Sequence, residues 1–150
     1  EPGSVTRDGA TGQRRAESLV ATMLARDAFS RWLGVEVVEL APGSCTTRMT
    51  VRAEMANGFG VAHGAIVFAL ADSAMAFACN GHGTVTVSVE NSVTYPAAVR
   101  VGDVLTARCE REAESGRLGY YRAPVTNQDG TVVALFRGTV YRTQKELQPE

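Results

Sequence analysis

One stretch of the chain is apolar on almost every side. Between Ala65 and Cys79 the only strongly polar residues are Asp72 and Ser73. A helix that lacks a polar face has to be covered by the rest of a soluble protein. The run therefore predicts a central, buried helix, and that helix takes the carboxylate of Asp72 with it.

The pattern before this helix has two different periods. From Arg14 to Trp32 the apolar residues fall near helical spacing and Gly34 follows, which predicts a short amphipathic helix. From Val35 the period changes to two, and a turn at residues 41–44 leads into β-prone residues that end at Arg52. We expect a hairpin here, followed by a loop that enters the central helix.

Strand patterns also dominate the sequence after the central helix. Residues 84–95 alternate, and the segments 103–114, 118–126 and 131–142 continue the pattern with turn residues between them. Each strand needs an apolar cover on one face, and the central helix needs cover on nearly all of its own surface. The predicted fold class is therefore α+β: a curved antiparallel sheet wrapped around one long buried helix, with a short N-terminal helix.

Length and composition fit a single domain. A chain of 150 residues with 45% hydrophobic residues can bury one core without metal or disulfide staples. We expect a mobile N-terminal segment at residues 1–13, one domain at residues 14–145 and a polar tail at residues 146–150. The first segment lacks the basic start and apolar core of a signal peptide, and the central run is too short to span a membrane, so we expect a cytoplasmic protein.

Charge and cysteine content argue against several function classes. A net charge of −1 gives no sign of nucleic-acid binding. The three cysteines, Cys45, Cys79 and Cys109, lack a Cys-x-x-Cys spacing, so we interpret them as reduced structural thiols. With His63 and His82 as the only histidines, the sequence also argues against a zinc site.

The residues that lead into the central helix are suited to hold a carbonyl group or an anion. Residues 57–60 are loop-forming, and His63 and Gly64 lead into the first turn. The first N–H groups of a helix have no internal partner, and Gly64 has no Cβ to keep another molecule away from them. Asp72 follows Gly64 at a distance of about 12 Å along the helix, so one helix cannot bring both to one small carbonyl. If they cooperate, two chains are involved.

Structural interpretations of the same residues stay open. An alanine-rich run can simply be a core helix, although a buried carboxylate costs several kcal/mol unless it is hydrogen-bonded, paired or functional. Asn57 suits a turn, His63 suits a helix cap or a core position, and Ser73 can bond the carbonyl four residues before it.

Taken together, these residues resemble the hotdog-fold acyl-CoA thioesterases, and among them the phenylacetic-acid-degradation branch. The likeness spans about residues 30–143, and its specific part is the spacing from Asn57 through Gly64 to Asp72. The residues that carry it are Asn57, His63, Gly64, the segment 68–72, Cys79, Asn80, the segment 95–97, and Gly102, Asp103, Leu105 and Ala107.

The resemblance implies a homodimer whose two sheets join edge to edge, commonly doubled to a tetramer, with active sites between subunits. It also implies that Asp72 is the catalytic carboxylate, that the Gly64 N–H of the other subunit polarises the thioester carbonyl, and that Asn57 helps to position the reacting groups. Coenzyme A enters as part of an acyl-CoA substrate, and no separate cofactor or metal is implied. The candidate substrate-binding residues are His63, Ser73 and Phe59.

The expected substrate is phenylacetyl-CoA or hydroxyphenylacetyl-CoA. The bulky side chains near the helix favour an aromatic acyl group; they are Phe59, Phe68, Met75 and Phe77. The branch motif His-Gly-Gly becomes His63-Gly64-Ala65 here, and the added methyl narrows the passage for the acyl group or pantetheine.

Two other functions stay open. A hotdog enoyl-CoA hydratase or dehydratase would use His63 and Asp72 as acid and base, although their spacing does not resemble that subfamily. A non-catalytic acyl-CoA-binding module is the second alternative. The buried carboxylate argues against a binding module, because burying a charge costs free energy and binding alone does not require a charge at that position.

Overall fold

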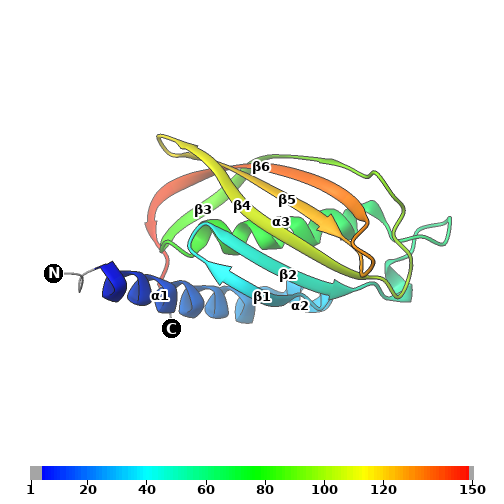
Figure 1. Ribbon diagram of the computed structural model, residues 1–150, viewed down its shortest axis with the longest axis horizontal. Coiled ribbons are helices and arrows are strands. Elements are labelled where there is room, and N and C mark those ends of the chain that lie inside the picture. The colour runs from blue at the N-terminus through cyan, green and yellow to red at the C-terminus, as the bar shows by residue number, and fades with distance from the viewer. Residues whose placement is uncertain (1–4, 149–150) are drawn as a thin grey trace.

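A computed structural model describes residues 5–148, and the remaining terminal residues lie outside it. In this part of the chain one long helix, α3, lies against a six-stranded sheet, and two helices precede the first strand (Figure 1). The elements are α1 (Val5–Arg26), α2 (Ala28–Leu33), β1 (Glu36–Ala41), β2 (Ser44–Thr50), the 3-10 turn η1 (Ala53–Met55), α3 (Gly64–Asn80), β3 (Thr84–Thr94), β4 (Val104–Ser115), β5 (Leu118–Thr126) and β6 (Val132–Glu146).

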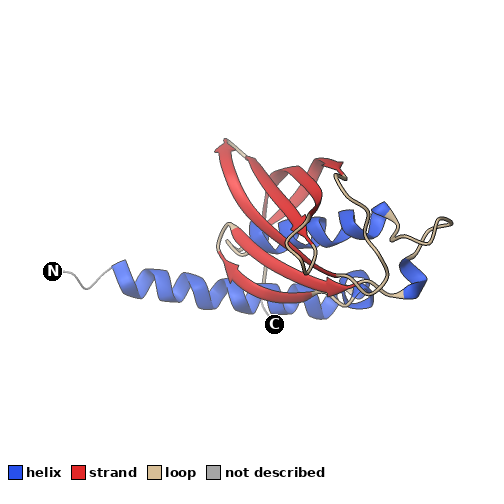
Figure 2. Ribbon diagram, turned by 45° about the vertical axis from the view of Figure 1, so that its right-hand side comes forward, coloured by secondary structure: helices blue, strands red, loops and turns tan. Residues whose placement is uncertain are grey.

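Helix α3 forms where the apolar run predicts it. Most of its side chains are buried, and in Figure 2 the curved sheet wraps around it. Its last residue, Asn80, fixes the start of β3, because the side-chain amide donates to the carbonyl of Thr86 at 3.0 Å and its oxygen accepts from the Thr86 N–H at 2.8 Å. Helix and sheet are therefore joined by packing along α3 and by a polar clamp at its end.

The sheet is antiparallel throughout, with the strand order β1-β2-β4-β5-β6-β3. In β4, Leu105, Ala107 and Cys109 are buried while Arg108 and Glu110 are exposed, as the alternation predicts. The predicted α+β class, with a curved antiparallel sheet around one buried helix, is confirmed.

The two edges of the sheet are unequal. Strand β1 has 6 residues, and Gln13 of α1 donates to the carbonyl of Leu40 on it at 2.6 Å. Strand β3 has 11 residues and, within the described chain, pairs with β6 alone. Its Val89 is 56% exposed. The long edge of the sheet is thus the uncovered one.

The N-terminal region differs from the sequence prediction in its boundaries. The single helix predicted from Arg14 to Trp32 is two helices, because Asp27 interrupts it and caps the second one by accepting from the Ser30 N–H at 2.9 Å. Gly34 ends α2 in the left-handed conformation, at φ 80°, which suits glycine. Helix α1 begins at Val5 rather than at Arg14, so much of the expected mobile segment is helical. Residues 1–4 lie outside the described chain, and the mobility of residues 1–13 stays a prediction.

The remaining elements lie close to their predicted positions. The hairpin forms from β1 and β2, and the four later strands begin and end within a few residues of the alternating segments. Strand β6 is longer than expected and includes Glu146, the first residue of the predicted polar tail.

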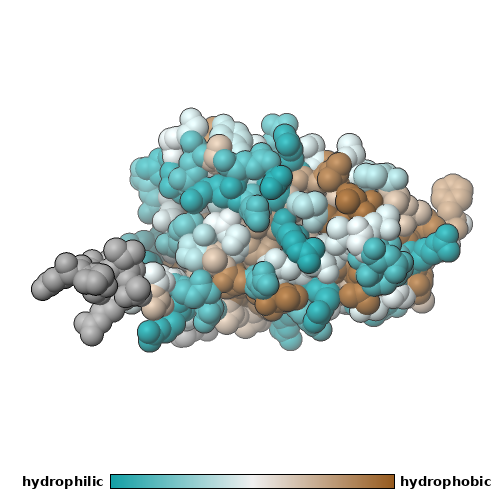
Figure 3. Space-filling view, viewed as in Figure 1, coloured by the Kyte–Doolittle hydropathy of each residue, from teal (hydrophilic) through white to brown (hydrophobic). Residues whose placement is uncertain are grey.

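The outer face of the sheet varies in hydropathy along its length. Figure 3 shows hydrophilic side chains toward the β4–β5 turn and hydrophobic ones toward the other end, where Val132 and Leu135 are exposed.

Candidate active site

The start of α3 offers one free backbone donor. His63 is the N-cap residue, and its Nδ1 accepts from the Ala65 N–H at 3.2 Å while its carbonyl accepts from the Ile66 N–H at 2.9 Å. The N–H of Gly64 has no acceptor among the described residues. It lies at the positive end of the helix dipole, where a developing negative charge is stabilised. The helix-cap interpretation of His63 is thereby confirmed.

Asn57 organises the loop before the helix. Its Oδ1 accepts from the Phe59 N–H at 2.9 Å and from the Val61 N–H at 3.4 Å, and its own N–H donates to the Val61 carbonyl at 2.7 Å. The turn role that the sequence left open is therefore present. The Nδ2 group of Asn57 has no partner in residues 5–148 and is available as a donor. Phe59, at the tip of the loop, is 93% exposed, so one subunit alone offers it no pocket.

Tyr95 lies directly against Gly64, and the sequence assigned it no role in the site. Its hydroxyl donates to the Gly64 carbonyl at 2.8 Å, and a Cβ added to Gly64 would lie 3.1 Å from the Tyr95 ring. The space expected to admit another molecule is thus partly filled by Tyr95. What remains open at Gly64 is its N–H, and a larger residue there would require the Tyr95 ring to shift.

Asp72 lies in the middle of α3 and is half-buried. Its Oδ1 accepts a hydrogen bond from Nδ2 of Asn91 on β3 at 3.3 Å, and its Oδ2 has no partner within the described part of the chain. The Oδ1 of Asn91 in turn accepts from the Ser88 hydroxyl at 2.9 Å. One carboxylate oxygen is held and the other is free. Sequence reasoning missed Asn91, although an asparagine amid β-branched strand residues is an unusual choice.

The surroundings of Asp72 make it a stronger base than an ordinary aspartate. Burial is the largest cause and raises the pKa of Asp72; the Asn91 hydrogen bond opposes this effect, and the negative charge of Asp27 adds to it. Because the folded-state pKa is raised, the ionised carboxylate lowers stability at pH values above its ordinary range. A carboxylate retained at such a cost is typical of a functional site.

Ser73, next to Asp72, faces another helix. The Ser30 hydroxyl donates to Oδ2 of Asp27 at 2.6 Å, so the Ser73 hydroxyl is left to donate to the Ser30 oxygen at 2.8 Å. Ser73 is buried and joins α3 to α2, rather than bonding the carbonyl four residues before it. Its hydroxyl is therefore satisfied inside the subunit.

The three cysteines lie in the core of the described chain. Cys45, Cys79 and Cys109 are buried free thiols. Burial raises the pKa of Cys45 and of Cys79 to about 12 and also raises the pKa of Cys109, so none of the three thiols is readily ionised to a nucleophile.

In residues 5–148 no three His, Cys, Asp or Glu side chains are grouped to hold a metal ion. No helix in that range is both long and apolar enough to cross a bilayer.

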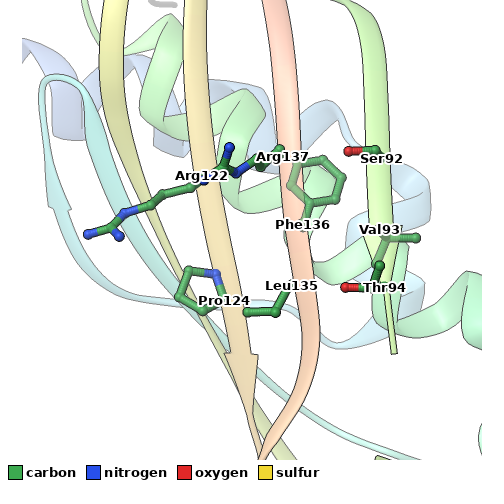
Figure 4. Close-up of a pocket in the computed structure, with 8 residues that line it drawn as sticks. All are labelled: Ser92, Val93, Thr94, Arg122, Pro124, Leu135, Phe136 and Arg137. Carbon is green, nitrogen blue, oxygen red and sulfur yellow. The ribbon is translucent and has the colours of Figure 1, made fainter. Parts of the chain in front are cut away.

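A groove of about 380 Å³ lies on the outer face of the sheet, away from α3 (Figure 4). Arg122 and Arg137 flank it, and both have carboxylate partners: Arg122 lies 3.5 Å from Glu110, and Glu112 lies 3.6 Å from Arg137. None of the candidate site residues lines this groove. The candidate active site is therefore at α3 and along the β3 edge.

Comparison with known proteins shows the family to which the chain belongs. A model of the thioesterase superfamily matches residues 59–134, which include α3 and the strands β3, β4 and β5. The chain therefore belongs to the thioesterase superfamily; its fold is the hotdog fold, and it is a thioester hydrolase.

Two relatives and one solved structure illustrate the relationship. The acyl-coenzyme A thioesterase PaaI of Escherichia coli (strain K12) is 35% identical over 120 residues, which cover 80% of this chain and 86% of that protein. Human acyl-coenzyme A thioesterase 13 is 32% identical over 133 residues, covering 85% and 93% of the two chains. The solved structure of the E. coli PaaI protein, from the phenylacetic acid degradation operon, has a TM-score of 0.87 at 32% identity, and the match covers 91% of this chain and 99% of that one.

Proposed function

We propose that this protein is an acyl-CoA thioesterase that hydrolyses an aryl-acetyl-CoA, phenylacetyl-CoA or hydroxyphenylacetyl-CoA, to the free acid and coenzyme A. The observation that carries the proposal is Asp72, a half-buried carboxylate with one free oxygen on the central helix of a thioesterase-superfamily chain. The reaction consumes water, and coenzyme A takes part only as a portion of the substrate.

The proposed chemistry needs a polarised carbonyl and an activated oxygen. The Gly64 N–H supplies the first, since a donor at a helix start stabilises the oxyanion and the loss of such a donor costs about 10² to 10³ in rate. Asp72 supplies the second, either by taking a proton from water or by attacking the carbonyl to form an anhydride. Its raised pKa favours both roles over that of a fully solvated carboxylate.

The two groups act on one thioester only across a subunit boundary. Both lie on α3, about 12 Å apart by helix rise. The uncovered edge of β3 is the surface that suits a second copy, because an 11-residue strand with an unpaired edge readily accepts another strand. Asn91, on that strand, touches Asp72. A homodimer joined at β3 would place the partner subunit next to the carboxylate, and a further pairing of dimers is part of the same proposal.

The other candidate residues take roles around this centre. Asn57 would position the reacting groups through its free Nδ2, in addition to holding its turn. His63 shapes the entrance by capping α3. Phe59, fully exposed in one subunit, would contact substrate only if a second subunit lies over it. Ser73 is the weakest candidate, since its hydroxyl is already bound to Ser30.

The aryl-acetyl group rests on the relatives rather than on the core aromatics. Met75 and Phe77 are buried, and the Phe68 ring packs edge-on against Phe136 at 5.4 Å, so these side chains belong to the core instead of an acyl pocket. The E. coli relative comes from a phenylacetic acid degradation operon, which favours a role in phenylacetate degradation for this chain. A cytoplasmic location belongs to the same proposal.

A substrate panel with free-thiol detection tests the proposal. Phenylacetyl-CoA, hydroxyphenylacetyl-CoA, benzoyl-CoA, hexanoyl-CoA, palmitoyl-CoA and an enoyl-CoA are compared by kcat/KM. We expect the two aryl-acetyl thioesters to lead. A clear preference for palmitoyl-CoA would overturn the substrate assignment. Hydration of the enoyl-CoA without thiol release would indicate a hydratase, and binding without turnover of any thioester would indicate a non-catalytic module.

A further inference from the structure

An asparagine on the edge strand reaches the carboxylate of the central helix. Asn91 on β3 pairs in register with Gly138 on β6, and its Nδ2 donates to Oδ1 of Asp72. A Cβ added to Gly138 would lie 2.7 Å from Oδ1 of Asn91 and closer still to Sδ of Met75. A Cβ at position 138 would therefore force the side chains of Met75 and Asn91 to shift. The amide of Asn91 therefore occupies space over β6 that only a glycine at position 138 leaves empty.

The carboxylate of Asp72 sets the orientation of this amide, because an ionised carboxylate only accepts hydrogen bonds and the NH₂ group must therefore face it. The Ser88 hydroxyl donates to Oδ1 of Asn91 at 2.9 Å. An amide whose oxygen accepts from a hydroxyl presents its NH₂ group on the opposite side, and here that side faces Asp72. The Ser88 hydroxyl, which can donate or accept, completes this arrangement by donating to the amide oxygen.

We propose that Asn91 is a positioning residue for Asp72, and that Gly138 provides the space that the Asn91 amide needs. The amide holds Oδ1, so Oδ2 is the oxygen presented to water or to the thioester carbonyl. Carboxylate rotation about its last bond is broad and roughly two-fold, so without an anchor neither oxygen has a fixed direction. The inference rests on the proposed function, in which Asp72 is the reacting carboxylate.

The electrostatic surroundings define what the loss of Asn91 should do. Among the described residues, the titratable group that acts on the pKa of Asp72 is Asp27, beside α2, while Cys79, on α3 itself, is acted on by the charge of Asp72. Neither is a cation. The Asn91 amide is the hydrogen-bond donor that favours the ionised form, so its removal leaves burial and Asp27 unopposed. The pKa of Asp72 then rises, and activity is lost at a higher pH as the solution is acidified.

The test compares Asn91→Leu, which keeps the size but removes the donor, with Gly138→Ala, which displaces the amide. Ser92→Ala is the matched control, because Ser92 is the next residue on β3 and faces the outer groove. The readouts are kcat and KM as a function of pH, and the ¹³C titration of the Asp72 carboxyl in the unliganded protein. We expect both variants to move the acidic limb and the carboxyl titration upward by about one pH unit. We also expect kcat on the pH plateau to fall about tenfold with KM little changed, and Ser92→Ala to behave as wild type.

A purely structural role of Asn91 predicts a different outcome. If Asn91→Leu folds normally and loses activity without any shift in the acidic limb or the carboxyl titration, the positioning role is wrong. Thermal unfolding of each variant separates this result from loss of fold, and the titration needs no turnover. If Asp72→Asn retained turnover while the carboxyl titration still moved in Asn91→Leu, the proposed function would fail and the hold of Asn91 on Asp72 would stand.

Discussion

The start and the middle of helix α3 present opposite chemical situations. At the start, the N–H of Gly64 has no acceptor among residues 5–148, and the nearby residues His63 and Phe59 are exposed. In the middle, Asp72 is half-buried, and one of its oxygens is held by Asn91. The donor is open to the outside, and the acceptor is enclosed by its own subunit. The Gly64 N–H and the Asp72 carboxylate of one chain lie too far apart to act on one carbonyl. They form one site only if a second subunit brings its own Gly64 N–H to this carboxylate.

Of the substitutions at Gly64 and Asp72, Asp72→Asn should lower thioesterase turnover the most. The side chain is nearly isosteric, so we expect the fold to persist while thioesterase turnover falls at least about a hundredfold, the scale of losing a general base or a nucleophile. Because the pKa of Asp72 is raised in the fold, the neutral amide should leave the melting temperature unchanged or higher. Steady-state kinetics with free-thiol detection and a thermal melt measure both. Near-wild-type hydrolysis by this variant would contradict the mechanism.

The next test concerns the open end of the helix. Gly64→Val places a branched side chain where even a Cβ lies 3.1 Å from the Tyr95 ring, so we expect it to lower turnover about tenfold to a hundredfold by blocking the donor. Gly12→Val is the matched control, because Gly12 also lies in a helix, α1, and a Cβ on it meets nothing within 4 Å. It should retain activity.

The same variant tests whether the site is shared. Co-expression of an Asp72→Asn chain with a Gly64→Val chain, each with a different affinity tag, yields heterodimers in which one of the two sites is intact. We expect these to regain a large part of the activity per intact site. Should purified heterodimers stay as inactive as both parents while all three remain folded dimers, Asp72 and Gly64 act within one chain.

A smaller effect is expected at Asn57, whose two functions can be separated. Asn57→Asp keeps the oxygen that accepts from the Phe59 and Val61 N–H groups but removes the free Nδ2 donor, whereas Asn57→Ala removes both. We expect both to lower kcat about tenfold or less, and only Asn57→Ala to lose about 1 kcal/mol of stability with the turn. Full activity in Asn57→Asp would leave Asn57 as a turn residue alone.

The sequence predicted those features that depend on one-dimensional patterns. The position of α3 follows from an apolar run interrupted only by Asp72 and Ser73, and the strands follow from their alternation. The break at Asp27 was missed because the apolar spacing continues through it, while the cap bond to Ser30 decides the structure locally. The order of strands in the sheet does not follow from alternation, since the period shows which residues share a face and not which strand lies beside another.

The candidate site was predicted in part for the same reason. Gly64 and Asp72 can be recognised in the sequence itself, because a glycine at a helix start and a carboxylate within an apolar helix are both unusual. Asn91 and Tyr95 lie in ordinary strand sequence and matter because folding brings them to Asp72 and to the Gly64 carbonyl. The bond between Ser73 and Ser30 was likewise invisible, since it joins residues 43 positions apart.

The burial of the three cysteines has a consequence for an enzyme whose product is itself a thiol. Coenzyme A released at the site, or its disulfide, exchanges with a protein cysteine only when that cysteine is accessible and ionised. Cys45 and Cys79 are buried with pKa values of about 12, and Cys109 is buried beside them. The folded protein therefore resists S-thiolation by its own product. A thiol-reactive dye in the assay reports released coenzyme A with little contribution from the enzyme.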